Sequence, residues 1–412
     1  MSIRKSVVIS FADQALLSLA NFLIGVFLIK NSAKEDYGMY VFAYAIILFM
    51  VSVQNALVTN QMTVMAPNKK PEERDYFCTT LAVGQYLVVV PLAFVGMVLI
   101  GIIDNLGLLD SGKVAMAYAV AVAILGVLLR EFIRVFFFLK LNTSTVLLLD
   151  FFHSILMLAG LWMASILVPN NLHMAAILIF GAASAVSGIS ACFLSKFSFR
   201  ARWMDIQNSL GEAWKNGRWA LGGVVLTLLE SQSYVYILTA ISGAASTAEV
   251  NAARLFLMPV ALLNVSVARV LMPRWGGWRA EGRYEHIISS ARKALMLIVA
   301  SILVYLFVLL WVKDLAIEVL LTKAYAGIGV YIMLWGVYFV LVAIRTNQSI
   351  LLQVYEDFRA ITLASIWSMM LVLSSSLVLI QYYGVPGSIL AMICGEIILT
   401  TLLTRRVNHV IG

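Results

Sequence analysis

The sequence predicts an all-α membrane protein of about twelve transmembrane helices, arranged as two six-helix bundles around a central cavity. Hydrophobic residues make up 62% of its 412 residues, and charged residues only 12%, whereas a soluble domain carries about 25%. The mean hydropathy is +0.94. So few charges cannot solvate a soluble surface of this size, which excludes a cytosolic enzyme or a secreted domain.

Apolar windows that do not overlap fill most of the chain, and each has roughly the 20 residues that cross a bilayer. The loops between them are too short to hold a catalytic domain. In the fourth window, Arg130, Glu131 and Arg134 lie in the last turns, near the expected headgroups. The windows are 9–29, 39–60, 77–102, 114–138, 146–168, 173–195, 219–241, 251–271, 294–312, 326–344, 360–382 and 385–403.

The positive charges predict the orientation, because Lys and Arg stay on the cytoplasmic side of short loops. With a cytoplasmic N-terminus, most of the 29 Lys and Arg residues fall inside. Both termini are then cytoplasmic. Attraction to anionic lipid at the inner surface accounts for the net charge of +8, so no nucleic-acid partner is expected. The cations left on the outside are Lys30, Lys34, Lys113, Lys313 and Lys323.

The windows divide into two halves. Residues 1–195 form an N-terminal six-helix bundle, 196–218 a basic cytoplasmic linker and 219–412 a C-terminal six-helix bundle. Each half opens on a polar-faced helix, which indicates a duplication with parallel repeats. Two bundles around a cavity are typical of a transporter that works by alternating access.

Motifs for catalysis are absent from the sequence. It has no P-loop, GxSxG, HExxH or DxD pattern, and its four His residues lie on different segments, so neither an enzyme nor a metal site is expected. Cys78, Cys192 and Cys394 are isolated in apolar windows and are interpreted as core residues. No cofactor is expected.

Polar side chains recur at helical spacing in four of the spans. They cost free energy in a bilayer unless they face a cavity or a partner, so they predict the wall of a wet cavity; interhelical hydrogen bonds are the alternative reading. The stripes are Ser10, Gln14, Ser18 and Asn21, with Asp13 close by; Tyr40, Tyr44, Ser52, Asn55 and Thr59; Thr227, Glu230, Ser231 and Tyr234; and Asn251, Arg254, Asn264, Ser266 and Arg269.

Charged members of these spans carry the sharpest hypotheses, because a charge at mid-bilayer costs about 2.5 to 3.5 kcal/mol. Arg254 is expected to bind substrate, although an ion pair with Glu230 would explain both residues. We expect substrate to be bound by Arg254, Asn251, Gln14, Asn21, Tyr44, Asn55, Glu230 and Tyr234.

A second group is expected to couple transport to ions or to lie at the inner interface. Asp150 and His153 are three residues apart and can touch, so this pair either relays a proton or caps the helix near the headgroups. Arg130 and Arg134 are expected to bind lipid phosphate, with substrate as the alternative. Arg269 completes the group.

Three stretches resemble the polysaccharide flippases of the MATE-like (MOP) exporter superfamily. They are SFADQALLSLANFLIGVFLIKNSAKEDYGMYVFAYAI at 10–46, LLREFIRVFFF at 128–138 and GRWA at 217–220. The resemblance implies a Wzx-type flippase in the bacterial inner membrane, which moves an undecaprenyl-diphosphate-linked oligosaccharide to the outer leaflet for O-antigen or capsule assembly. It implies membrane lipids and polysaccharide polymerase machinery as partners. Relatives that flip other diphosphate lipids use several cavity arginines, whereas the first span here has none.

Physical chemistry agrees with this reading. A sugar chain needs a wet, polar passage, because unsatisfied hydroxyls are costly in hydrocarbon, and Arg254 suits a diphosphate. Two negative charges moving outward gain up to about 4 to 5 kcal/mol at 100 mV, while coupling to protons or sodium through Asp150, His153 or Glu230 stays open.

Two other classes of function stay open. The first is a cation-coupled drug or metabolite exporter of the same superfamily, which predicts an acid-dominated cavity. The second is a membrane scaffold or transferase, which needs large loops or a catalytic constellation, and neither is visible in the sequence.

Overall fold

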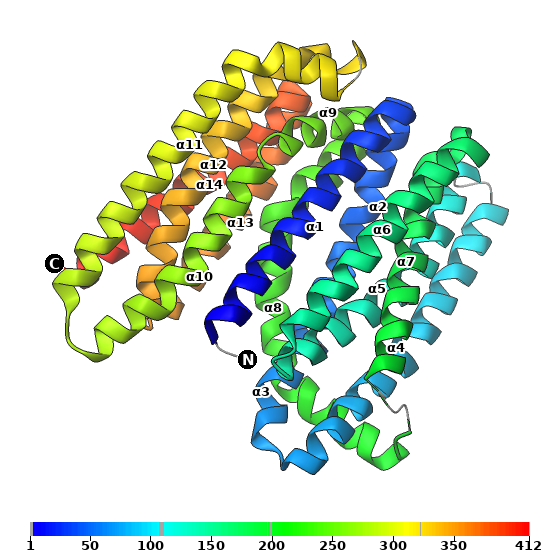
Figure 1. Ribbon diagram of the computed structural model, residues 1–412. Coiled ribbons are helices and arrows are strands. Elements are labelled where there is room, and N and C mark those ends of the chain that lie inside the picture. Colours follow the sequence, from blue (N-terminus) through cyan, green and yellow to red (C-terminus); the bar gives the residue numbers. More distant parts are fainter. Residues whose placement is uncertain (1–2, 107–110, 196, 198–199, 322, 412) are drawn as a thin grey trace. The chain divides into compact units, whose positions relative to one another are not determined.

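The computed structural model describes residues 3–106, 111–195, 197, 200–321 and 323–411, and these residues form helices and short connections with no strand (Figure 1). The α-helices are α1 (Ile3–Asn31), α2 (Lys34–Gln54), α3 (Asn60–Met65), α4 (Pro71–Asn105), α5 (Ser111–Leu139), α6 (Thr143–Leu167), α7 (Leu172–Leu194), α8 (Trp203–Ser242), α9 (Ala244–Leu255), α10 (Met258–Ala280), α11 (Tyr284–Leu320), α12 (Gly329–Val354), α13 (Phe358–Tyr383) and α14 (Val385–Ile411).

The predicted all-α membrane fold is confirmed, since 11 helices in the described ranges are long and apolar enough to cross a membrane. The eighth window, 251–271, was wrong as one continuous span. Its residues divide between α9, which ends at Leu255, and α10, which begins at Met258. Pro259 lies in the first turn of α10, where its missing N–H is tolerated, but it could not continue α9 without losing a hydrogen bond.

The chain forms two compact units. Unit 1 comprises Met1–Ile24 and Met39–Val225, and unit 2 comprises Gly25–Gly38 and Leu226–Gly412. The linker over 196–218 stays a prediction; in the structure, α8 begins within it at Trp203 and runs unbroken to Ser242. Hydrogen bonds within unit 1 hold the start of α8. Tyr76 donates to Asp205 at 2.6 Å.

The turn between α1 and α2 belongs to unit 2 although it lies early in the sequence. A Cβ added at Gly25 would lie 2.9 Å from the Leu255 side chain, and one at Gly38 would lie 1.8 Å from the Ala244 carbonyl oxygen. Lys34 forms an ion pair with Glu249. At Gly38 the neighbour is backbone, so only glycine fits there, and this close approach lets the turn pack against α9 within unit 2.

Small residues bring α5 and α7 close together in unit 1. A Cβ at Gly126 of α5 would lie 2.2 Å from the Gly181 carbonyl oxygen, and a Cβ at Gly188 of α7 would lie 3.2 Å from the Arg130 backbone nitrogen. Small residues at helix interfaces allow such close approach in membranes. This packing fixes the position of the Arg130 backbone relative to α7.

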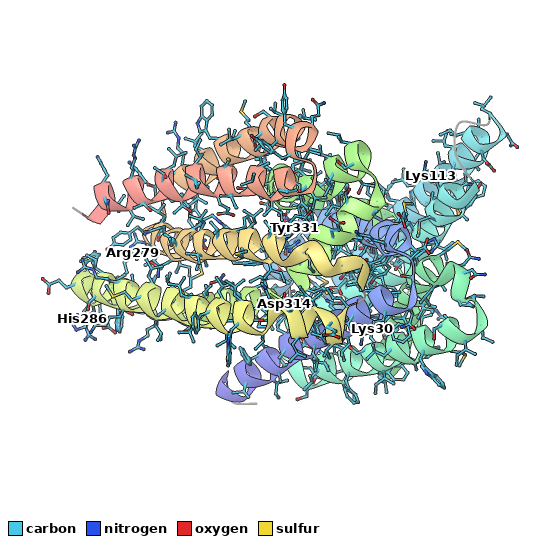
Figure 2. All side chains as sticks on the ribbon, turned by 90° about the horizontal axis from the view of Figure 1, so that it is seen from above. Lys30, Lys113, Arg279, His286, Asp314 and Tyr331 are labelled. Carbon is cyan, nitrogen blue, oxygen red and sulfur yellow. The ribbon has the colours of Figure 1, made fainter. Side chains whose placement is uncertain are left out.

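Unit 2 contains a long helix, α11, and closely packed helices α13 and α14. The 37 residues of α11 extend about 55 Å at 1.5 Å per residue, and Figure 2 places Arg279 and His286 near one end of unit 2 and Asp314 and Tyr331 nearer the other. The turn from α13 to α14 uses Gly384 at φ 61°, a left-handed conformation that favours glycine. A Cβ at Gly395 would lie 2.1 Å from Val372, so α13 and α14 pack closely.

Candidate functional site

Five charged side chains meet inside unit 1, from α1, α5 and α6. Arg130 Nη2 donates to Asp150 Oδ1 at 2.5 Å and its Nη1 to Glu131 Oε1 at 3.0 Å. Arg134 donates through Nε to Asp150 Oδ2 at 2.7 Å and through Nη2 to Asp13 Oδ2 at 2.8 Å. With three acids and two bases, this acidic cluster carries one negative charge if all five groups are ionised.

The acidic cluster brings together three of the predicted coupling residues. The side chains of Arg130 and Arg134 are only 6% and 15% exposed, and carboxylates occupy them. The structure therefore argues against lipid phosphate as their ligand. Asp150 is fully buried and does not cap its helix, because α6 begins at Thr143 with Asn142 as its N-cap. Its carboxylate binds the two arginines, and no hydrogen bond joins it to His153 among the described residues.

A cavity of about 180 Å³ lies beside the acidic cluster, and unit 1 alone supplies its walls. Tyr44 lies 6.0 Å from Tyr40 in a stacked pair and 5.5 Å from Phe180 edge to face, between ring centroids. His153 packs against Phe180 at 5.6 Å. The polar and aromatic members of the wall are Asn21, Tyr40, Tyr44, Arg130, Glu131, His153, Ser154 and Phe180.

Two predicted substrate residues of unit 1 lie outside the lining of this cavity. Gln14 is partly exposed on α1. Asn55 opens a π-helical turn, Asn55–Thr59, that joins α2 to α3, and its side-chain oxygen accepts a hydrogen bond from Thr59 Oγ1 at 2.7 Å. Such turns interrupt a regular helix and are frequent at functional sites, yet here Asn55 serves the local bend.

Three predicted substrate residues of unit 2 form one hydrogen-bonded chain at the break between α9 and α10. Arg254 Nη1 donates to the Tyr234 hydroxyl at 2.7 Å, and that hydroxyl donates to Asn251 Oδ1 at 3.1 Å. The guanidinium carbon lies 5.3 Å from the Trp335 ring centroid. Arg254 sits in the last turn of α9, where the helix dipole favours a cation. No carboxylate of the described residues lies within ion-pair distance of it.

Glu230 takes part in a different cluster of unit 2. Its carboxylate accepts a hydrogen bond from Ser368 at 2.6 Å, and Arg345 Nε donates to Glu396 at 2.9 Å. The alternative reading of Glu230 and Arg254 as an ion pair does not hold, since each residue has other partners. Two acids and one base again leave one negative charge in excess.

Some site residues were missed at the sequence level and others cannot be placed. Glu396 lies inside the predicted window 385–403, where the cost of a buried charge would have marked it. Arg345 directly follows the window 326–344 and was counted as a loop residue, but α12 continues through it to Val354. The side chains of Ser266 and Arg269 lie outside the described residues.

No group of three or more metal-ligating residues was found among the described residues. The site chemistry that the described residues offer is therefore hydrogen bonding, aromatic contact and charge, supplied by the acidic cluster and cavity of unit 1 and by Arg254 and Glu230 with their partners in unit 2.

Comparisons with known proteins agree on the fold. No protein-family model matches the sequence, and no curated protein matches it. Among solved structures, a lipid II flippase MurJ in an inward closed conformation has a TM-score of 0.80 at 14% identity, with 97% of this chain and 87% of that chain covered. An inward-facing multidrug resistance MATE family transporter of the MOP superfamily has a TM-score of 0.72 at 10% identity, with 96% and 94% covered. A eukaryotic MATE transporter has a TM-score of 0.67 at 12% identity, with 97% and 94% covered. The fold is therefore that of the MurJ and MATE proteins.

Proposed function

We propose that this protein is a flippase that moves an undecaprenyl-diphosphate-linked oligosaccharide from the inner to the outer leaflet of the bacterial inner membrane by alternating access. Arg254 carries the proposal. It is a cation in a largely apolar helical bundle, it has no carboxylate partner among the described residues, and Tyr234 holds its guanidinium in place. A phosphate oxygen is a ligand that would complete its charge-assisted hydrogen bonds.

The local structure supports a ligand at Arg254. A guanidinium kept in a membrane protein without a counter-ion is costly, and a structural role would be met more cheaply by a carboxylate partner. The Tyr234–Asn251 hydrogen bond orients the hydroxyl that accepts from Arg254, so the arginine is positioned before any ligand binds. Both the fold shared with a lipid II flippase and this cation favour a diphosphate lipid over an uncharged substrate.

The same proposal includes the membrane potential as the energy source for export. The membrane potential favours outward movement of two negative charges by up to about 4 to 5 kcal/mol at 100 mV, so net export needs no second ion. The excess of carboxylates in the acidic cluster and around Glu230 would also suit coupling of transport to a cation. Unchanged flipping at fixed potential after the proton and sodium gradients are abolished would leave the potential as the drive.

The test measures the leaflet distribution of lipid-linked oligosaccharide in cells depleted of the protein and then supplied with a variant. We expect the intermediate to collect on the cytoplasmic face, wild type to clear it, and Arg254→Ala to fail. Arg283→Ala is the matched control, because Arg283 pairs with Glu281 and its side chain is 48% exposed. If depletion causes no accumulation, the flippase proposal is wrong; if Arg254→Ala clears it as wild type does, the site is wrong.

Topology and partners can be tested beside function. We expect both termini on the cytoplasmic side, which reporter fusions at the two ends would show. Crosslinking in membranes would test contact with polysaccharide polymerase machinery.

A cation-coupled drug or metabolite exporter is the second candidate. The carboxylate excess of the acidic cluster favours it, because Asp13, Glu131 and Asp150 outnumber Arg130 and Arg134. This function predicts that depletion raises sensitivity to cationic compounds without any accumulation of lipid-linked sugar, a result opposite to that expected for the flippase.

A further inference from the structure

We propose that the cavity of unit 1 binds one neutral sugar ring of the translocated oligosaccharide. The inference rests on the proposed function and names the part of the substrate that this cavity takes. Its volume, its aromatic walls, its unpaired polar atoms and its balance of charge each point to a pyranose.

The volume sets the size of the ligand. The cavity measures about 180 Å³. Sites for drug-sized ligands begin near 300 Å³. One six-membered ring with its hydroxyls fits this space, while a chain of sugars or a large planar drug does not.

The aromatic walls provide a surface for the apolar face of such a ring. Tyr44 lies between Tyr40 and Phe180, with centroid distances of 6.0 Å and 5.5 Å. An aromatic face is negative and attracts positively polarised edges such as C–H groups. A pyranose presents several axial C–H groups on one face, so it can lie against Tyr44 or Phe180 while its hydroxyls point elsewhere.

Polar atoms with no partner are available for those hydroxyls. His153 is only 5% exposed, yet its Nδ1 has no hydrogen-bond partner among the described residues, while its ring has a backbone hydrogen bond to Ala183. The Nε of Arg130, another wall residue, likewise has no hydrogen-bond partner in the described part of the chain. Together they offer both donors and acceptors, which is what sugar hydroxyls need.

Charge excludes the diphosphate from this cavity. The charged wall residues are Arg130 and Glu131, one of each sign, joined at 3.0 Å. Arg134 and Asp150 behind them are bonded to each other at 2.7 Å. Carboxylates thus occupy both Nη groups of Arg130 and all three nitrogens of Arg134. With Asp13 included, the acidic cluster has one carboxylate in excess, which repels an anion. The two charged groups that line the cavity itself, Arg130 and Glu131, cancel each other, which fits a neutral ligand.

Saturation-transfer NMR on the full-length protein in lipid nanodiscs tests the proposal. The probes are methyl glucoside, methyl galactoside, methyl mannoside and methyl N-acetylglucosaminide, each without a lipid. We expect at least one of them to give ring-proton signals. We expect binding to weaken about tenfold in Tyr44→Leu and in His153→Leu, and to persist in the control Phe94→Leu, whose side chain is 63% exposed on α4 of the same unit.

The outcomes separate this proposal from the flippase function, because binding needs no flipping. Tyr44→Phe keeps the ring and folds as a conservative variant, so it should retain most of the signal and lose only the hydroxyl contact. Competition by tetraphenylphosphonium would identify a cation site and overturn the proposal, as would signals unchanged in Tyr44→Leu and His153→Leu or absent for all four sugars. If the protein binds a sugar but its depletion causes no accumulation of lipid-linked oligosaccharide, the flippase function is refuted. The cavity would then be a sugar site, but not a site for the translocated oligosaccharide.

Discussion

The buried acidic cluster makes a quantitative prediction for Asp150→Asn. The side chain of Asp150 is 0% exposed and accepts hydrogen bonds from Arg130 and Arg134 at 2.5 Å and 2.7 Å. Asparagine keeps the shape but removes the charge that both guanidinium groups face. Breaking a buried ion pair by removing one partner costs about 3 to 5 kcal/mol. Because Glu131 and Asp13 still neutralise the arginines, we expect the lower end, about 3 kcal/mol.

The assay is equilibrium unfolding of the purified protein in mixed micelles, titrated with SDS and followed by Trp fluorescence. Asp314→Asn is the matched control. Asp314 pairs with Lys313 but its side chain is 86% exposed, and such pairs contribute about 0 to 1 kcal/mol. Equal losses for the two variants would refute the claim that burial gives the cluster its stability. The double variant R134L/D150L should lose less than the sum of its single variants, since neither charge is then left alone.

Three further predictions concern packing, thiols and pH. Gly126→Leu should lower the free energy of unfolding by at least about 1 to 3 kcal/mol, because its Cβ would lie 2.2 Å from a carbonyl oxygen of α7. Gly211→Ala should instead stabilise the protein, because no atom lies within 4 Å of the added Cβ. Thermal unfolding of the two variants distinguishes these effects. Cys78 is fully buried, so maleimide should label it only after unfolding, as mass spectrometry of the labelled peptide would show. The Arg406 guanidinium that donates to Asp357 lowers the pKa of that carboxyl in the folded protein. The ionised carboxylate therefore stabilises the fold above about pH 4, the pKa of an unfolded Asp, and this stabilisation is lost as the pH falls through the lower folded pKa. Asp357→Asn should remove this part of the acid sensitivity in thermal melts measured across pH.

The helices were predictable because the bilayer imposes one length on every span. Runs of apolar residues located eleven of them, since a backbone in hydrocarbon must satisfy its hydrogen bonds internally. The break between α9 and α10 was not predicted, although Pro259 within the window 251–271 was a visible signal. A run of apolar residues indicates that the segment lies in lipid, but it does not show whether the segment is one helix. Here the proline, which has no N–H to donate, was the signal that the run is interrupted.

Grouping by helical face selected Tyr234, Asn251 and Arg254 as candidates, but it predicted neither their hydrogen-bonded chain nor the acidic cluster. Asn251 and Arg254 share α9, whereas the contact to Tyr234 depends on how α8 packs against α9. Arg134 meets Asp13 across 121 residues, and that pairing depends on how α1 packs on α5. Phe180 gave no signal, because an aromatic residue in an apolar span is equally suited to lipid and to a cavity wall.

Arg254 of unit 2 differs from Arg130 and Arg134 of unit 1 in its partners, and we propose that the two environments suit different parts of a substrate. In unit 1, carboxylates neutralise Arg130 and Arg134, and His153 Nδ1 in the wall of the adjoining cavity has no hydrogen-bond partner among the described residues. In unit 2, Arg254 has a hydroxyl and aromatic rings for neighbours but no acid among the described residues. A lipid-linked oligosaccharide carries neutral sugar rings and an anionic diphosphate, which require these two environments separately. The carboxylate excess of the acidic cluster would suit a cationic drug, but such a drug does not require an arginine without a counter-ion, so Arg254 is the observation that supports the proposed lipid-linked sugar.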